Sequence, residues 1–136
     1  MAQQGGCVCG NIRFAIEGEP VAKALCHCRD CRKISGSAYS TNATWPENQF
    51  KLNQGTPKTH VKTADSGNTI TSFFCGDCGS TMWRETAAFE GVKIVKVGTL
   101  DDDDALNAAK PANEFFISSR VSWLQAIPDA EQKETM

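Results

Sequence analysis

Three signals that would direct a chain to nucleic acid, membrane or export are missing from this sequence of 136 residues. Basic residues are not in excess, because 14 Lys and Arg face 16 Asp and Glu and leave a formal net charge of -2. We therefore expect no nucleic-acid partner, since such partners are bound largely through their phosphates. No run approaches the ~18 apolar residues of a membrane span, so no membrane partner is expected. The start of the chain also lacks the basic and apolar regions of a secretory signal, which predicts a cytoplasmic protein.

Disordered and collagen-like classes are excluded by composition, because 40% of the residues are hydrophobic and only 22% are charged. The length suits one ordinary domain. We predict a single domain over residues 1–136 with its core at about residues 6–126. Residues 129–136 are expected to be solvated and frayed.

Alternating apolar residues predict a mainly β fold with short helices. Ile12, Phe14 and Ile16 would share one face of a first strand over residues 11–16. Further strands are expected over residues 21–25, 38–45, 60–63, 69–74, 80–84 and 92–97, with a hairpin turn at residues 65–68. Residues 46–55 are predicted to be a loop that directs Phe50 and Leu52 inward.

Helical turns are expected after the cysteines of residues 26–31, ending at Gly36, and over residues 105–109. From Pro111 onward, an apolar segment is expected to close over the sheet; its bulky residues are Phe115, Phe116, Trp123 and Leu124. The acidic run at residues 101–104 is expected to be a solvated turn.

Seven cysteines are the most informative feature of the sequence. An odd number excludes a disulfide framework that uses them all, and a reducing compartment keeps thiols free unless a metal binds them. They occur as Cys7-Val8-Cys9, Cys26-His27-Cys28-Arg29-Asp30-Cys31 and Cys75-Gly76-Asp77-Cys78. The two pairs, each followed by glycine, supply the four thiolates of a closed zinc site, whereas the triplet leaves a fourth position for water or substrate.

Other interpretations of the cysteines stay open at this point. Iron, in a rubredoxin-like site or an iron–sulfur cluster, uses similar spacings, and disulfides in an exported protein are a further alternative. His27 or another protein ligand would close the triplet, but an extended segment directs the His27 ring away from the shared metal. We expect His27 to support the ligands from behind or to face solvent, and His60 to be a surface or packing residue.

The cysteines belong to longer motifs in a fixed order. These are Gly6-Cys7-Val8-Cys9-Gly10, Cys26-His27-Cys28, Cys31-Arg32-Lys33, Ser35-Gly36-Ser37, Phe74-Cys75-Gly76-Asp77-Cys78-Gly79-Ser80, Val97-Gly98-Thr99-Leu100-Asp101-Asp102, and Pro111 and Glu114 with Phe116, Arg120 and Trp123. Together they resemble the glutathione-dependent formaldehyde-activating family, which includes the centromere-protein-V-like proteins. The resemblance spans about residues 6–123 and implies a zinc-bearing fold of the β-tent kind.

The resemblance also implies roles for all seven cysteines and two zinc ions per chain. The structural zinc ligands would be Cys7, Cys9, Cys75 and Cys78, and the catalytic zinc ligands Cys26, Cys28 and Cys31. The implied reaction condenses glutathione with formaldehyde to S-(hydroxymethyl)glutathione, a carbon–sulfur lyase step on a small thiol and an aldehyde. A non-enzymatic zinc-binding module, or another lyase or isomerase reaction on the same scaffold, is the alternative.

Basic residues flank the triplet. Arg29, Arg32 and Lys33 are candidates for neutralising its thiolates and for binding glutathione carboxylates, although ordinary solvated charge is an equal alternative. Ser35, Gly36 and Ser37 would line the substrate approach or form a plain turn. Arg84 and Arg120 are expected to pair with carboxylates or to bind an anionic substrate. Trp45, Trp83 and Trp123, with Tyr39, are expected in the core or at its rim.

Overall fold

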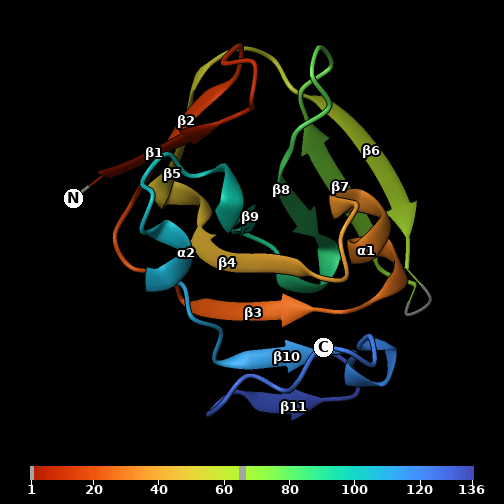
Figure 1. Cartoon of the computed structure of the whole chain (residues 1–136). Helices are drawn as coiled ribbons and strands as arrows, with labels where there is room; N and C mark the ends of the chain where they lie inside the picture. Colours follow the sequence, from red (N-terminus) through yellow and green to blue (C-terminus); the bar gives the residue numbers. More distant parts are fainter. Residues whose placement is uncertain (1, 65–66) are drawn as a thin grey trace.

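The computed structural model describes residues 2–64 and 67–136 (Figure 1). Its strands are β1 (Ala2–Gly6), β2 (Arg13–Glu17), β3 (Ala22–Cys26), β4 (Ser40–Pro46), β5 (Phe50–Gln54), β6 (Lys58–Thr63), β7 (Thr69–Phe74), β8 (Thr81–Thr86), β9 (Val92–Lys96), β10 (Asn113–Phe115) and β11 (Glu131–Lys133). The α-helices are α1 (Arg29–Ser35) and α2 (Ala105–Ala108), and the 3-10 turns are η1 (Glu47–Gln49), η2 (Ala87–Phe89), η3 (Val97–Thr99) and η4 (Ile117–Ser119).

The described strands form two sheets. A small antiparallel sheet has the order β1-β2-β5, and a large sheet has the order β11-β10-β3-β4-β9-β8-β7-β6. Only β10 runs parallel to its neighbours, β3 and β11, among these pairs. The predicted mainly β, single-domain fold with short helices is therefore confirmed. Within the described ranges, no helix combines the length and apolar content that crossing a membrane requires.

The hydrophobic core lies between the small sheet and one face of the large sheet. Phe14 is fully buried on β2, and its ring stacks on Phe50 of β5 with centroids 5.1 Å apart. Phe50 in turn lies 4.7 Å from Trp83 of β8, which stacks on Phe73 at 4.8 Å. Aromatic contacts of this kind add to the free energy of burial, so they hold the two sheets together.

The apolar alternation expected over residues 11–16 is confirmed, because all three of its apolar side chains are buried. Trp45 and Trp83 are core residues, as expected. Trp123 instead is 74% exposed, and the segment after Pro111 does not close over the sheet. Its backbone extends the sheet edge as β10, so the predicted apolar cover is wrong.

Two strands were missed in the N-terminal half. The expected loop at residues 46–55 contains β5, which pairs with β2, and Leu52 is 40% exposed rather than directed inward. β1 has the polar, glycine-rich sequence AQQGG, which carries no alternation to detect. Gly5 is required there, because a Cβ atom on it would lie 2.7 Å from the Phe14 ring and 2.8 Å from the Thr99 carbonyl oxygen.

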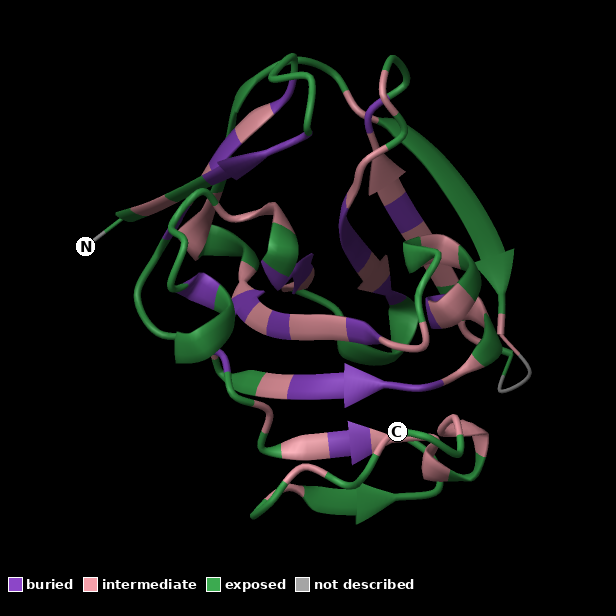
Figure 2. Ribbon diagram, viewed as in Figure 1, coloured by how far each residue is buried: buried purple, intermediate pink, exposed green. Residues whose placement is uncertain are grey.

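The C-terminal tail differs from expectation in one respect. Residues 131–133 are exposed, as predicted, but they are not frayed, because β11 pairs in parallel with β10. Figure 2 shows β6 and β11 exposed along their length, whereas β3 ends in buried residues. The hairpin turn predicted at residues 65–68 includes residues 65 and 66, which lie outside the described ranges; the strands on either side, β6 and β7, are antiparallel.

An ion pair between Arg13 and Asp101 ties the small sheet to the segment after η3. The hydrogen bond from Arg13 lowers the pKa of Asp101, so this carboxylate stabilises the fold above about pH 4 and loses its contribution as the pH falls further. Because both groups are partly exposed, we expect Asp101→Asn to lower the unfolding free energy by less than about 1 kcal/mol at pH 7. Urea unfolding at pH 7 and pH 3 tests this, with the exposed Asp103→Asn as the control; an equal loss at both pH values would contradict it.

Candidate metal centres

The first cysteine cluster unites the two glycine-followed pairs. Cys7 directly follows β1, and Cys75 directly follows β7, so the cluster joins the small sheet to the large one. The four Sγ atoms of Cys7, Cys9, Cys75 and Cys78 all lie within 4.8 Å of one another. The Cys7–Cys9 separation is 3.5 Å and the Cys9–Cys75 separation is 3.7 Å. A zinc tetrahedron with bonds of about 2.3 Å has edges of about 3.8 Å, so this donor set fits a closed thiolate site.

Backbone groups around this cluster are arranged for thiolates. The Ile12 N–H donates to Cys7 Sγ at 3.2 Å, and the Asp77 N–H donates to Cys75 Sγ at 3.4 Å. Gly79, after the second pair, has a φ of 81°, the positive value expected for these turns. Hydrogen bonds from the Ser80 side chain and backbone lower the pKa of Cys78 to about 5. A backbone hydrogen bond at Asn11 lowers the pKa of Cys9, but burial and the neighbouring cysteines outweigh it and raise that pKa to about 12. The backbone groups therefore favour anionic sulfur at Cys78, whereas Cys9 favours the thiol.

The second cluster surrounds the start of α1. Cys26 ends β3, Cys28 is the helix N-cap, and Cys31 lies in the first turn, where its N–H donates to Cys28 Sγ at 3.3 Å. Their Sγ atoms also lie within 4.8 Å of one another. Among the described residues, no fourth His, Cys, Asp or Glu ligand atom joins this group. All seven cysteines are free thiols, so neither cluster is a disulfide.

The three sulfurs of the second cluster share charge. Hydrogen bonds from Cys26 and Cys28 are the largest cause that lowers the pKa of Cys31, to about 2, and the positive charge of Lys96 and the Ser40 hydroxyl lower it further. The same hydrogen bonds, together with burial, raise the pKa of Cys26. The thiolate of Cys31 is thus stabilised by the two neighbouring thiols.

His27, between the ligands of this cluster, does not belong to it. Its side chain is buried, and Nε2 lies 2.8 Å from Glu114 Oε1 on β10. The alternative of a solvent-facing ring is therefore wrong, and a supporting role behind the ligands stays a prediction. His60 is exposed on β6, as expected of a surface residue.

Glu114 is buried and contacts several segments of the chain. The sequence motifs did not identify it as the partner of His27. Its Oε2 atom accepts hydrogen bonds of 2.7 Å from the Ile127 N–H and from Gln132 Nε2, and Arg120 Nη2 lies 3.4 Å away. Burial raises the pKa of Glu114, but the hydrogen bonds from Gln132, Ile127 and His27 outweigh it and lower that pKa. Arg120 therefore pairs with a carboxylate, one of its two predicted roles. The only sequence signal was the position of Glu114 in the C-terminal motif.

The basic residues predicted near the triplet lie on the outside of α1. Arg29 and Lys33 are exposed, and Arg32 is half-buried. A buried cation was missed: Lys96 of β9, whose Nζ donates to Asn42 Oδ1 at 2.7 Å. Arg84 of β8 is also buried, and its Nε donates to Ser72 Oγ at 3.0 Å.

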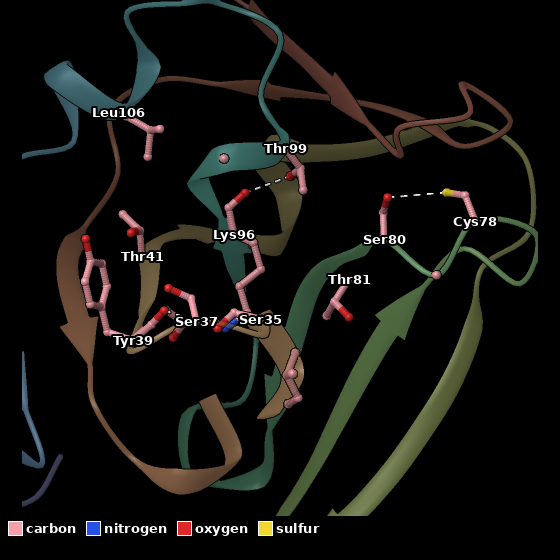
Figure 3. Close-up of a pocket in the computed structure, with 14 residues that line it drawn as sticks. Ser35, Ser37, Tyr39, Thr41, Cys78, Ser80, Thr81, Lys96, Thr99 and Leu106 are labelled. Carbon is pink, nitrogen blue, oxygen red and sulfur yellow. Dashed lines mark hydrogen bonds between the residues drawn. The ribbon is translucent and has the colours of Figure 1, made fainter. Parts of the chain in front are cut away.

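A cavity of about 600 Å³ lies beside the first cysteine cluster, and its lining also includes Ile34 and Ser35 of α1, the helix that carries the second cluster, although Cys26, Cys28 and Cys31 are not among the lining residues (Figure 3). Cys78 of the first cluster lines it, and so do Ser40 and Lys96, which lower the pKa of Cys31 in the second. Many residues in the rest of the lining carry a hydroxyl group; they are Ser35, Ser37, Tyr39, Thr41, Ser80, Thr81 and Thr99. Of the predicted approach, Ser35 and Ser37 line this cavity and Gly36 does not. The cavity has a size that holds small ligands.

Comparisons with known proteins agree with this architecture. The sequence profile of the family described as glutathione-dependent formaldehyde-activating enzyme matches residues 2–119. The crystal structure of a Rhodobacter sphaeroides protein superposes with a TM-score of 0.62 at 18% identity, covering 79% of this chain and 96% of that one. At this identity the likeness shows a shared fold. No curated protein matches the chain significantly.

Proposed function

Because the chain belongs to the glutathione-dependent formaldehyde-activating family, we propose that it is a zinc-dependent carbon–sulfur lyase that condenses glutathione with formaldehyde. The observation that carries the proposal is the second cluster, in which three cysteine sulfurs converge without a fourth protein ligand among the described residues. A closed structural site needs four ligands, whereas a catalytic zinc keeps one position for water or substrate. The first cluster, with four sulfurs, has the composition of the structural site.

The residues at the second cluster have separate roles in the proposed reaction. Cys26, Cys28 and Cys31 would hold the ion, which when bound favours the thiolate form of an incoming thiol. Lys96 and the Ser40 hydroxyl stabilise negative charge on sulfur at the same place. Thiolate is the nucleophilic form, so both effects favour attack of glutathione sulfur on the formaldehyde carbon, followed by protonation of the resulting alkoxide.

The surroundings suit a small polar substrate. The hydroxyl-rich cavity offers donors and acceptors to a peptide such as glutathione. The exposed Arg29 and Lys33 and the half-buried Arg32 lie outside it on α1, where they could bind a glutathione carboxylate. We place the reaction in the cytoplasm, where seven free thiols persist and glutathione is abundant.

Metal content and reaction rate test this proposal together. We expect two zinc ions per chain in the wild type and one in Cys28→Ser, measured by mass spectrometry of the metal and by X-ray absorption. We also expect the wild type to speed adduct formation, followed by exchange NMR, and Cys28→Ser to lose this effect. Uncatalysed condensation is the necessary control. Equal rates with and without wild-type protein would overturn the reaction, and two zinc ions in Cys28→Ser would overturn the site.

A further inference from the structure

The large sheet buries two basic side chains, Lys96 and Arg84: the charge of Lys96 acts on Cys31 of the second cysteine cluster, and the charge of Arg84 acts on Lys96. Lys96 pairs across the sheet with Asn42, and Arg84 pairs with Ser72 on one side and Ile94 on the other. Since Ile94 and Lys96 are two residues apart on β9, Arg84 and Lys96 point to the same face of the sheet. Both are more than nine-tenths buried.

Neither cation has a carboxylate partner among the described residues. The ion pairs of the described chain involve other basic residues, and the printed partners of Lys96 and Arg84 are the uncharged Asn42 and Ser72. A buried charge is costly unless it is paired, so these two require negative charge nearby. Burial lowers the pKa of Lys96, and the negative charge of the second cluster acts in the opposite direction, so its thiolates supply part of the negative charge required. With three thiolates, a divalent ion and two cations, the site would keep one net positive charge, which an anionic ligand would neutralise.

Lys96 is also placed to meet that ligand. It lines the 600 Å³ cavity, and in Figure 3 its side chain extends between Tyr39 and Ser37 on one side and Thr81 on the other. Of its three N–H donors, one is used by Asn42 Oδ1. Asn42 Nδ2 also donates to Ser40 Oγ at 3.0 Å, so the amide holds the ammonium in place and leaves the Ser40 hydroxyl proton free for Cys31. Two donors of Lys96 remain for the cavity.

We propose that the cavity binds acidic thiols, and that Lys96 anchors a substrate carboxylate there while the sulfur lies at the second cysteine cluster. This inference rests on the proposed function, because it assigns the substrate class of the same site. Lys96 thereby becomes a specificity-determining residue inside the cavity. The exposed cations of α1 are left to contact a second carboxylate outside it.

Binding of small matched probes tests the inference without measuring turnover. Zinc-loaded protein is titrated by calorimetry with 3-mercaptopropionate and with its neutral analogue, 3-mercaptopropionamide. We expect the wild type to bind the carboxylate about 10- to 100-fold more tightly, and Lys96→Met to reduce this ratio to about twofold or less. Lys96→Arg, which keeps the charge, should retain most of the preference, and Lys51→Met, on the exposed edge of the small sheet, should leave it unchanged. Circular dichroism and zinc content confirm that each variant is folded and loaded.

The outcomes separate this inference from the proposed function. If the wild type binds 3-mercaptopropionate and 3-mercaptopropionamide equally, Lys96 does not anchor a carboxylate, although a thiol site remains. This result does not depend on the folding of any variant. A preference for the carboxylate probe that persists in Lys96→Met would also overturn the role of Lys96 as the anchor. If 3-(methylthio)propionate, whose sulfur is blocked, binds as tightly as 3-mercaptopropionate and requires Lys96, the anchor is supported and the thiol function fails. If none of the probes binds, both fail.

Discussion

Replacement of Cys75 by serine is expected to unfold the domain at 25 °C. Cys75 is buried at the end of β7, and its sulfur lies 3.7 Å from that of Cys9 in the loop after β1, so the first cluster joins the two sheets. Structural zinc contributes on the order of 10 kcal/mol of apparent folding free energy, which is comparable to the whole stability of an ordinary domain. Circular dichroism on heating, with the zinc content of the purified protein, measures the effect.

The matched control for this prediction is Cys28→Ser, which removes one sulfur from the second cluster. That cluster is local to the end of β3 and the start of α1 and joins no distant segments, so we expect the variant to stay folded with one zinc ion. Chelation of the wild type should reproduce the Cys75→Ser result and not the Cys28→Ser result. A Cys75→Ser protein that melts cooperatively near the wild-type temperature would show that the first cluster is dispensable for folding.

The two cysteine clusters were the most predictable part of the molecule because their signal is local in sequence. Within each motif, the spacing of the cysteines alone brings their sulfurs to one point. Cys7 and Cys9 are separated from Cys75 and Cys78 by about half of the chain, yet their union was predicted by counting ligands, and the structure brings these four together. The turns of Gly10 and Gly79, both with positive φ, were predictable for the same local reason.

What the sequence did not reveal depends on partners that lie far away in the chain. β1 and β5 carry few apolar residues and become strands because β2 lies between them. Nothing in the sequence distinguishes Lys96 within the strand predicted over residues 92–97. Only the pairing of β9 with β4 places Lys96 beside Asn42, at the wall of the cavity. Leu52 and Trp123 were expected to pack by virtue of being apolar, but hydrophobic side chains are also common on protein surfaces.

Replacement of Glu114 by alanine is expected to destabilise the protein by about 3–5 kcal/mol. The carboxylate joins His27, beside the second cluster, to the backbone of Ile127 and to Gln132 of β11. Its loss would leave the buried His27 ring, the half-buried Ile127 N–H and the nearby Arg120 without their acceptor, together with the more exposed Gln132. Glu114→Gln keeps the shape but turns one acceptor into a donor that faces other donors, so we expect a smaller loss of about 1–3 kcal/mol. Urea unfolding of the zinc-loaded proteins measures both, and Glu131→Gln, an exposed glutamate on β11, is the control.

The pH dependence of the stability lost in the Glu114 variants shows whether Glu114 stabilises the protein by its charge or only by its packing. The pKa of Glu114 is lower in the folded protein than in the unfolded chain, so its charge contributes fully above about pH 4.5 and progressively less as the pH falls through the folded-state value. The stability difference between wild type and Glu114→Gln should therefore be largest near neutral pH and shrink in acid. Because outer hydrogen bonds orient ligand loops, zinc affinity at the second cluster should also fall by about 10- to 100-fold in Glu114→Ala. A pH-independent difference, with zinc affinity unchanged, would mean that Glu114 fills space at the sheet edge and that His27 does not depend on its charge.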